Sequence, residues 1–242
     1  MQPNGFAILY EQGPCLVVSK PAGILTQAPP GIDSLEFRIK QFLIQRENKP
    51  GRAYLGVPHR LDRPVSGALV VAKHVRAARR LSEQFEGRIV QKTYWAVVEG
   101  ELATDQGRWI DRVRKVPNEA RSEVVADDQK DARRAVLSYQ VRLRFEGKTW
   151  LEITLETGRY HQIRVQASSH GHPVVGDALY GATTSFGPSS DDPRDLMIAL
   201  HARDLTFRHP MTKEDVSVTA PLPPAWSEFG DAIIACDDGE SR

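Results

Sequence analysis

An aspartate in the segment 59–67 is the residue of this chain best suited to act as a nucleophile or a base. The segment reads His-Arg-Leu-Asp-Arg-Pro-Val-Ser-Gly, so Asp62 has one arginine two residues before it and another directly after it. Pro58 and Pro64 prevent a continuous helix here. Because nearby cations favour the charged form of a carboxyl group, we expect Asp62 to stay ionised. From spacing alone, however, the more common role of such an aspartate is to cap a turn or to form a salt bridge.

A second group of functional side chains lies in the segment 157–165. It contains two arginines, a histidine and a glutamine within six residues: Arg159, His161, Gln162 and Arg164. If a helix starts near Tyr160, Arg164 lies one turn further along the same face. Arg159 and His161 near the helix start would suit a phosphate group. The alternative is a set of surface arginines on an amphipathic helix, and the crowding of functional groups argues against it.

An aromatic residue, Tyr94, stands near the start of a predicted strand, in the sequence Lys-Thr-Tyr-Trp at 92–95. Its ring could stack on a nucleobase and its hydroxyl could exchange a proton. Packing on the core face of the sheet is the more common role for a tyrosine in such a position.

The histidines raise the alternative of a metal site. Imidazole and carboxylate groups together can bind zinc, and the candidates are His161, His170, His172, His201 and Asp177. The pattern is weak because no HExxH motif and no cysteine partner is present, so we expect no metal. Neither a GxxxxGK[ST] loop nor a GxGxxG turn occurs, so ATP and nicotinamide cofactors have no support in the sequence.

The elements that must position these residues can be predicted from periodicity and from helix and turn signals. Helices are predicted at 34–46, with Asp33 or Ser34 as cap, at 75–86, ended by Gly87, and at 160–169, ended by Gly171. Strands are predicted at 8–11, 16–19, 67–72, 91–99, 134–145, 150–155, 197–202, 205–208 and 216–219.

Two regions are predicted to lack regular structure. Residues 101–131 are polar and broken, which indicates loops or an insertion, and residues 183–195 are predicted to form an exposed loop. The strands outnumber the helices and mostly follow one another as hairpins. The pattern therefore predicts the α+β class with a largely antiparallel sheet.

The composition is that of an ordinary globular chain. The 242 residues are 40% hydrophobic and 26% charged, and a single domain over 1–242 is predicted. The net charge of +1 argues against coating of nucleic acid by bulk attraction. Basic residues nevertheless cluster at 76–80 and 108–115, so one face can still be basic.

Two cysteines, Cys15 and Cys236, stand near opposite ends of the chain, which suits a reducing compartment. No apolar run approaches the roughly 20 residues needed to cross a bilayer, and no signal peptide is visible. We therefore expect a cytoplasmic protein with no membrane partner.

Taken together, the motifs resemble those of the RluA-type pseudouridine synthases. They occur in the family's order over nearly the whole chain: Lys20-Pro-Ala-Gly23, His59-Arg-Leu-Asp62 with Ser66-Gly67, Lys92-Thr-Tyr94, Gly158-Arg-Tyr-His-Gln-Ile-Arg164, Gly171-His-Pro173 with Gly176-Asp177, His201-Ala202, and Phe207-Arg-His-Pro210 with Pro221-Leu-Pro223. Tyr160 stands where the family often has a small Ser or Thr, and Val65 where it usually has Thr.

The resemblance implies a pseudouridine-synthase fold, with a mixed and mainly antiparallel central sheet, flanking helices and an active-site cleft across the sheet. It further implies one catalytic domain without an N-terminal S4-type RNA-binding domain. Uridine in RNA would be converted to its C-glycoside isomer without a cofactor or metal. Asp62 would be the nucleophile or base, Arg164 would pair with it and lower its pKa, and Tyr94 would stack on the uracil.

The target nucleotide must leave its stack to react. Arg60 would fill the vacated space, and His59, Arg159, His161 and Gln162 would contact the substrate. The partner would be ribosomal RNA, transfer RNA or both, bound by a monomer. Two rivals stay open, a metal-dependent hydrolase using His161, His170, His172 and Asp177, and a non-catalytic RNA-binding module.

Overall fold

The computed structural model describes residues 3–48, 51, 53–192, 194–230 and 233. These residues form ten strands, three α-helices and two short 3₁₀ helices. The chain divides into two compact units, one made of residues 1–92, 190–195 and 202–242 and the other of residues 93–189 and 196–201. No helix within the described ranges is long and apolar enough to cross a membrane. Cys15 is buried, and Cys236 lies outside the described residues.

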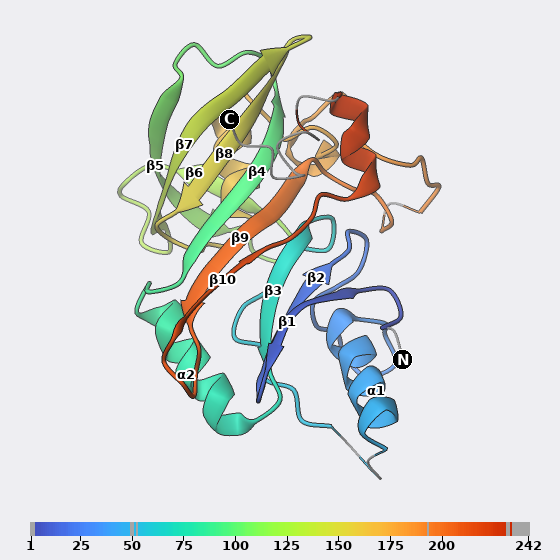
Figure 1. Ribbon diagram of the computed structural model, residues 1–242. Helices are drawn as coiled ribbons and strands as arrows, with labels where there is room; N and C mark the ends of the chain where they lie inside the picture. The colour runs from blue at the N-terminus through green and yellow to red at the C-terminus, as the bar shows by residue number, and fades with distance from the viewer. Residues whose placement is uncertain (1–2, 49–50, 52, 193, 231–232, 234–242) are drawn as a thin grey trace. The chain divides into compact units, whose positions relative to one another are not determined.

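The first unit contains an antiparallel meander of three strands. β1 (Ala7–Gln12) pairs with β2 (Cys15–Lys20), which pairs with β3 (Ser66–Ala72), and the three lie side by side in Figure 1. Every residue of β3 is buried, as a continuous apolar run predicts. β10 (Asp215–Thr219) pairs antiparallel with β9 (Leu200–Arg208). The predicted hairpins in this unit are confirmed.

Two helices belong to the first unit. In α1 (Leu35–Glu47) the Ser34 hydroxyl caps the helix by accepting the Phe37 N–H at 3.2 Å. Ser34 is one of the two residues predicted as the cap. α2 (Val75–Glu86) ends as predicted, but Gly87 has an ordinary helical φ of −74°. The left-handed residue that ends the helix is Arg88, with φ of 57°. A 3₁₀ helix, η2 (Pro224–Phe229), follows β10.

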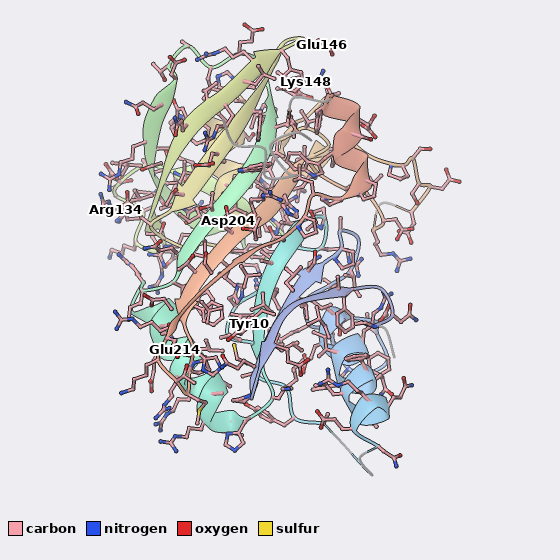
Figure 2. All side chains as sticks on the ribbon, viewed as in Figure 1. Tyr10, Arg134, Glu146, Lys148, Asp204 and Glu214 are labelled. Carbon is pink, nitrogen blue, oxygen red and sulfur yellow. The ribbon has the colours of Figure 1, made fainter. Side chains whose placement is uncertain are left out.

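The second unit contains a sheet in which the order of strands is β4 (Gln91–Glu99), β8 (Lys148–Leu155), β7 (Arg133–Phe145), β5 (Gln106–Lys115) and β6 (Ser122–Val125). Each neighbouring pair is antiparallel. Glu146 and Gly147, which both have positive φ, form the tight turn between β7 and β8, in the gap between the strands predicted at 134–145 and 150–155. Figure 2 labels Glu146 and Lys148 at this turn and Arg134 near the other end of β7. The unit also contains α3 (Gln162–Ser169) and η1 (Ala178–Tyr180).

The prediction that residues 101–131 form only loops is wrong, because β5 and β6 lie there. In β5 only Trp109 and Val113 are buried, and the half-buried Asp111 between them interrupts the apolar alternation. The intervening arginines are held by carboxylates on other segments, such as Arg108 by Glu156 and Arg114 by Glu123. Hydrogen bonds to β7 therefore form this strand without a local apolar pattern.

Two further boundaries differ from the prediction. The strands expected at 197–202 and 205–208 form one strand, β9, because the polar pair between them is satisfied inside the sheet. Arg203 donates to the Ala220 carbonyl at 2.6 Å, and Asp204 accepts the Thr219 hydroxyl at 2.6 Å. The described part of 183–195 forms no helix or strand, as predicted, although Phe186 within it is buried.

Candidate active site

Asp62 lies in the first unit, on a short turn that leads directly into β3. Its carbonyl accepts the Val65 N–H at 3.1 Å, which closes the turn over Arg63 and Pro64. The residue is half-buried. The carboxylate is therefore carried by a turn whose far end continues into a fully buried strand.

The residues on either side of Asp62 are tied to the segment that follows β2. Thr26 Oγ1 donates to the Leu61 carbonyl at 2.7 Å and accepts the Leu61 N–H at 3.1 Å. The Arg63 carbonyl accepts the Gly23 N–H at 2.9 Å and the Lys20 Nζ at 3.1 Å. Such contacts hold the carrier of a reactive group in one position. The Lys-Pro-Ala-Gly segment, named above only as one of the motifs that resemble the family's, thus anchors the turn.

Lys20 contacts the turn of Asp62, and the sequence reasoning did not select it as a candidate site residue. Its side chain is fully buried, and its ammonium also donates to the Pro21 carbonyl at 2.7 Å. Burial lowers the pKa of Lys20 to about 7, while the charge of Asp62 raises it and the charge of Arg63 lowers it. Because a cation within electrostatic reach favours the carboxylate, protonated Lys20 helps to keep Asp62 ionised.

His59 fastens the same segment to β3. Its Nε2 accepts the Val70 N–H at 3.0 Å, and its ring stacks on Phe85 with 4.3 Å between centroids. Burial, and secondly the charge of Lys92, lowers the pKa of His59 to about 3. The ring is therefore neutral, and its Nε2 is occupied as the acceptor of the Val70 N–H. A contact with the substrate could use only Nδ1. Arg60, next to it, is exposed.

In the second unit, Arg164 forms a buried ion pair with Asp177. Arg164 Nε lies 2.6 Å from Asp177 Oδ2 and Nη2 lies 2.8 Å from Oδ1, so the pair is bidentate. Both side chains are nearly fully buried, with exposed fractions of 6% and 2%. The guanidinium also lies over the Tyr180 ring, 5.0 Å from its centroid. A bidentate pair fixes both the charge and the orientation of the guanidinium.

The helix that carries Arg164 begins two residues later than predicted, at Gln162. His161 has a left-handed φ of 54°, which is incompatible with the first turn of the helix. Its Nδ1 lies 2.9 Å from the Tyr180 hydroxyl, which accepts the Ser122 N–H at 2.8 Å. The C-terminal end behaves as predicted, because Gly171 has a φ of 82°.

The Gln162 amide braces the loop before the helix. Its oxygen accepts the Thr157 hydroxyl at 2.8 Å and the Arg159 N–H at 2.9 Å, and its nitrogen donates to the Val136 carbonyl at 3.1 Å. Both ends of the amide therefore bond within the protein. Arg159 is half-buried, and its Nε donates to the Arg134 carbonyl at 3.0 Å.

Tyr94 lies on β4, opposite Ile153 of β8, and is 9% exposed. The placement follows from the predicted strand, which has the predicted bounds. The stacking of the Tyr94 ring on uracil stays a prediction.

The four residues of the rival metal site have separate partners. His161 bonds to Tyr180, His170 to Asp111, His172 to the Glu99 carbonyl and Asp177 to Arg164. Among the residues that the structure describes, no group of three or more His, Cys, Asp or Glu could hold a metal ion. The histidine spacing in the sequence therefore does not produce a ligand cluster, and the rival hydrolase is not supported.

Comparisons with known proteins identify the family. Residues 14–169 match the family described as RNA pseudouridylate synthase, and this range includes Asp62, Tyr94 and Arg164. The chain belongs to this family. It is 37% identical over 223 residues to ribosomal large subunit pseudouridine synthase D of Xanthomonas campestris, which covers 89% of this chain and 66% of that relative. The chain thus spans just under two thirds of that relative's length.

A relative of similar length and a solved structure agree with this assignment. The chain is 32% identical to an uncharacterized RNA pseudouridine synthase of Zymomonas mobilis, over 92% of this chain and 96% of that one. The structure of human RNA pseudouridylate synthase domain containing 4 is 22% identical, with a TM-score of 0.73, over 90% of this chain and 88% of that one. That likeness supports the α+β fold.

Proposed function

We propose that this protein isomerises uridine in RNA to pseudouridine. The observation that carries the proposal is the tethered turn of Asp62, which presents one carboxylate beside a buried lysine in a member of the pseudouridylate synthase family. The N1–C1′ bond breaks, a C5–C1′ bond forms, the C5 proton leaves and N1 gains a proton. The product has the same composition as the substrate, so the balance needs no oxidant, reductant or second substrate.

Asp62 acts as the nucleophile or base, so that one difficult step becomes two easier ones. Arg164 is the cation that the family resemblance pairs with the catalytic carboxylate, and Asp177 holds its guanidinium in place through Nε and Nη2. A guanidinium carries five N–H donors, so it can serve two carboxylates at once. Tyr94 stacks on the uracil, and Arg60 fills the space of the flipped base.

The substrate in this proposal is ribosomal RNA, because the Xanthomonas relative is named for the large ribosomal subunit. Transfer RNA is the second candidate. The protein acts in the cytoplasm as a monomer, with one catalytic domain and without a nucleotide cofactor.

The test is a map of pseudouridines in ribosomal and transfer RNA from cells with and without the gene. We expect at least one position to lose its pseudouridine, to regain it with the wild-type gene, and to stay unmodified with the Asp62→Asn gene. Identical maps in both strains would contradict the proposal. Recovery with the Asp62→Asn gene would leave a non-catalytic RNA-binding module as the better account.

A further inference from the structure

The exposed face of α2 carries its charges in the reverse of the usual order. Arg76 lies in the first turn, which holds no acidic residue, and Glu86 lies in the last turn, which holds no basic one. The helix dipole makes the N-terminal end positive, so a cation there usually lowers stability. The arrangement therefore does not serve the stability of the helix, and residues that break such a local rule are commonly kept for binding.

Two arginines of this face are available to a ligand. The Arg76 side chain is exposed and has no ion-pair or hydrogen-bond partner among the described residues. Its backbone N–H already donates to His74 Nδ1 at 3.2 Å, so the guanidinium is the group that is left to bind. Arg79 Nε lies 3.4 Å from Glu83, and the two side chains are 74% and 59% exposed. Such an exposed pair is weak, so a phosphate can take the place of the carboxylate.

The third arginine of the cluster, Arg80, is already used inside the protein. It is half-buried, and its Nη1 donates to the Pro210 carbonyl at 2.8 Å, in the turn between β9 and β10. Both ends of the Gln84 amide bond to the backbone of Arg208, at 2.8 Å each. This side of α2 therefore packs on the end of the β9–β10 pair (Figure 1), and the face with the other two arginines stays exposed.

An aromatic side chain borders the same face. Tyr54 is 45% exposed. A Cβ on Gly56 would lie 2.3 Å from the Ala78 Cβ and 3.0 Å from the Tyr54 hydroxyl. The Tyr54 hydroxyl therefore lies close to the residue that precedes Arg79 on α2. Basic side chains beside an exposed aromatic ring are the combination that binds single-stranded nucleic acid, through its phosphates and its stacked bases.

α2 is attached to the segment that carries Asp62. Phe85, near the end of the helix, stacks on His59, which is three residues before Asp62. A helix rises about 1.5 Å per residue, so Arg79 and Arg76 lie about 9 and 14 Å along the axis from Phe85. Contacts of these arginines therefore fall on nucleotides outside the one that reacts.

We propose that Arg76, Arg79 and Tyr54 form an RNA-docking face for a single strand outside the target uridine. The two arginines bind phosphates, and the Tyr54 ring stacks on a base. The inference deepens the proposed function, and it rests on that function for the identity of the ligand as RNA. An acidic peptide would also be attracted to the arginines, but it has no base to stack on Tyr54.

The first measurement is the affinity for a fluorescent single-stranded oligouridine of about 16 nucleotides, over a range of salt concentrations. For the double variant Arg76→Gln, Arg79→Gln we expect Kd to rise about fivefold, as for two exposed ion pairs. The salt slope of log K should become less steep by about 1.4, since each phosphate on a single strand contributes about 0.7. Tyr54→Ala should raise Kd about tenfold and keep the salt slope, because stacking releases no counterion.

The matched control is the double variant Arg38→Gln, Arg142→Gln. It removes the same charge from two partly exposed arginines that pair with Asp33 and Glu152, and we expect wild-type affinity and salt slope. An equal loss in the control would show a general effect of charge and overturn the proposal. Equally tight binding of polyglutamate, unchanged by Tyr54→Ala, would indicate an acidic peptide as the ligand and overturn it as well.

A melting experiment separates a binding role of the arginines from a structural one. Because Arg76 opposes the helix dipole, the double variant of Arg76 and Arg79 should melt no more than about 2 °C below wild type. A larger fall in the melting temperature together with the loss of affinity would make the two arginines structural and contradict the proposal.

The second measurement is release of tritium from ribosomal RNA labelled at uridine C5. The double variant of Arg76 and Arg79 should raise KM about fivefold and leave kcat nearly unchanged, because it weakens binding outside the reacting nucleotide. A fall in kcat alone, or a wild-type Kd and KM, would overturn the proposal. Failure of the proposed function is distinguishable, because the wild-type protein would then release no tritium while its binding of oligouridine would still respond to the substitutions.

Discussion

Because it belongs to a buried ion pair with Asp177, Arg164 is expected to contribute to stability as well as to activity. The sequence alone suggests that Arg164→Met should abolish turnover and leave melting nearly unchanged. The structure changes that expectation, because the substitution leaves the buried Asp177 carboxylate without its bidentate partner. Removing one partner of a buried ion pair usually costs about 3–5 kcal/mol of stability.

We therefore predict that Arg164→Met lowers the free energy of unfolding by about 3–5 kcal/mol and also abolishes tritium release. Urea denaturation and the tritium assay measure the two effects. The double variant Arg164→Met, Asp177→Leu should recover most of the stability, since no buried charge is left, but none of the activity. A wild-type urea midpoint for the single variant would contradict this reading of the pair.

His59 gives a prediction about pH. Its pKa is about 3 in the folded protein, against an ordinary value of 6.5. At pH values between these two, the unfolded chain binds a proton at this position and the folded protein does not. The contribution of His59 to the free energy of unfolding therefore rises with pH across this window and is lost on acidification. The loss from this group is up to about 1.4 kcal/mol for each pH unit below 6.

His59→Gln keeps an acceptor for the Val70 N–H and does not titrate. We predict that the free energy of unfolding of wild type, relative to that of this variant, falls as the pH is lowered from 6.5 to 4. The measurement is a series of urea titrations at fixed ionic strength. A difference that does not depend on pH would mean that His59 is accessible to protons in the folded state.

At the scale of elements, Gly67 allows β3 to meet β9. Its φ is 121°, and a Cβ on it would lie 2.2 Å from the Ala202 carbonyl oxygen. We predict that Gly67→Ala lowers the free energy of unfolding by about 3 kcal/mol or more, because strain and overlap add.

The matched control for this variant is Gly13→Ala, in the turn between β1 and β2. Gly13 also has a positive φ, of 52°, but a Cβ there would meet no atom within 4 Å. It should cost only the left-handed penalty, about 1–2 kcal/mol. Equal effects of the two substitutions in thermal unfolding would refute the role assigned to the contact with Ala202.

Elements with local signals could be predicted from the sequence. The Ser34 cap, the turn at Glu146 and Gly147, and the apolar run of β3 each depend on neighbouring residues. β5 could not, because its charged residues find their partners on other segments.

The candidate site follows the same rule. Asp62 and Arg164 could be selected from their motifs. The supports could not, since Lys20 meets the Arg63 carbonyl 43 residues away in the sequence, and Arg164 meets Asp177 13 residues away.

At the scale of the whole molecule, the net charge of +1 does not show how the charges are paired. Many arginines form ion pairs with carboxylates of the same chain. In the cluster 108–115, Arg108 pairs with Glu156 and Arg114 with Glu123, at distances of 2.6 and 2.7 Å. Exposed pairs of this kind contribute about 0–1 kcal/mol each, so RNA phosphates can replace the carboxylates at low cost. Contacts of this cluster with RNA phosphates would therefore require an exchange of partners.

Chelators should not change the activity of the protein. Asp62, Lys20 and Arg164 supply the proposed chemistry from side chains alone. We predict that dialysis against EDTA changes the rate of tritium release less than about twofold, well below the loss expected when a catalytic metal is removed. Loss of activity that is restored by zinc would return the metal-dependent rival to consideration.

The most direct measurement of the central claim is tritium release from C5-labelled uridine in RNA by Asp62→Asn, beside the wild-type protein. The substitution replaces the carboxylate by an amide of the same shape and removes the nucleophile. We predict a loss of about three orders of magnitude or more in rate, with unchanged RNA affinity and circular dichroism. Release at the wild-type rate by Asp62→Asn would contradict the account.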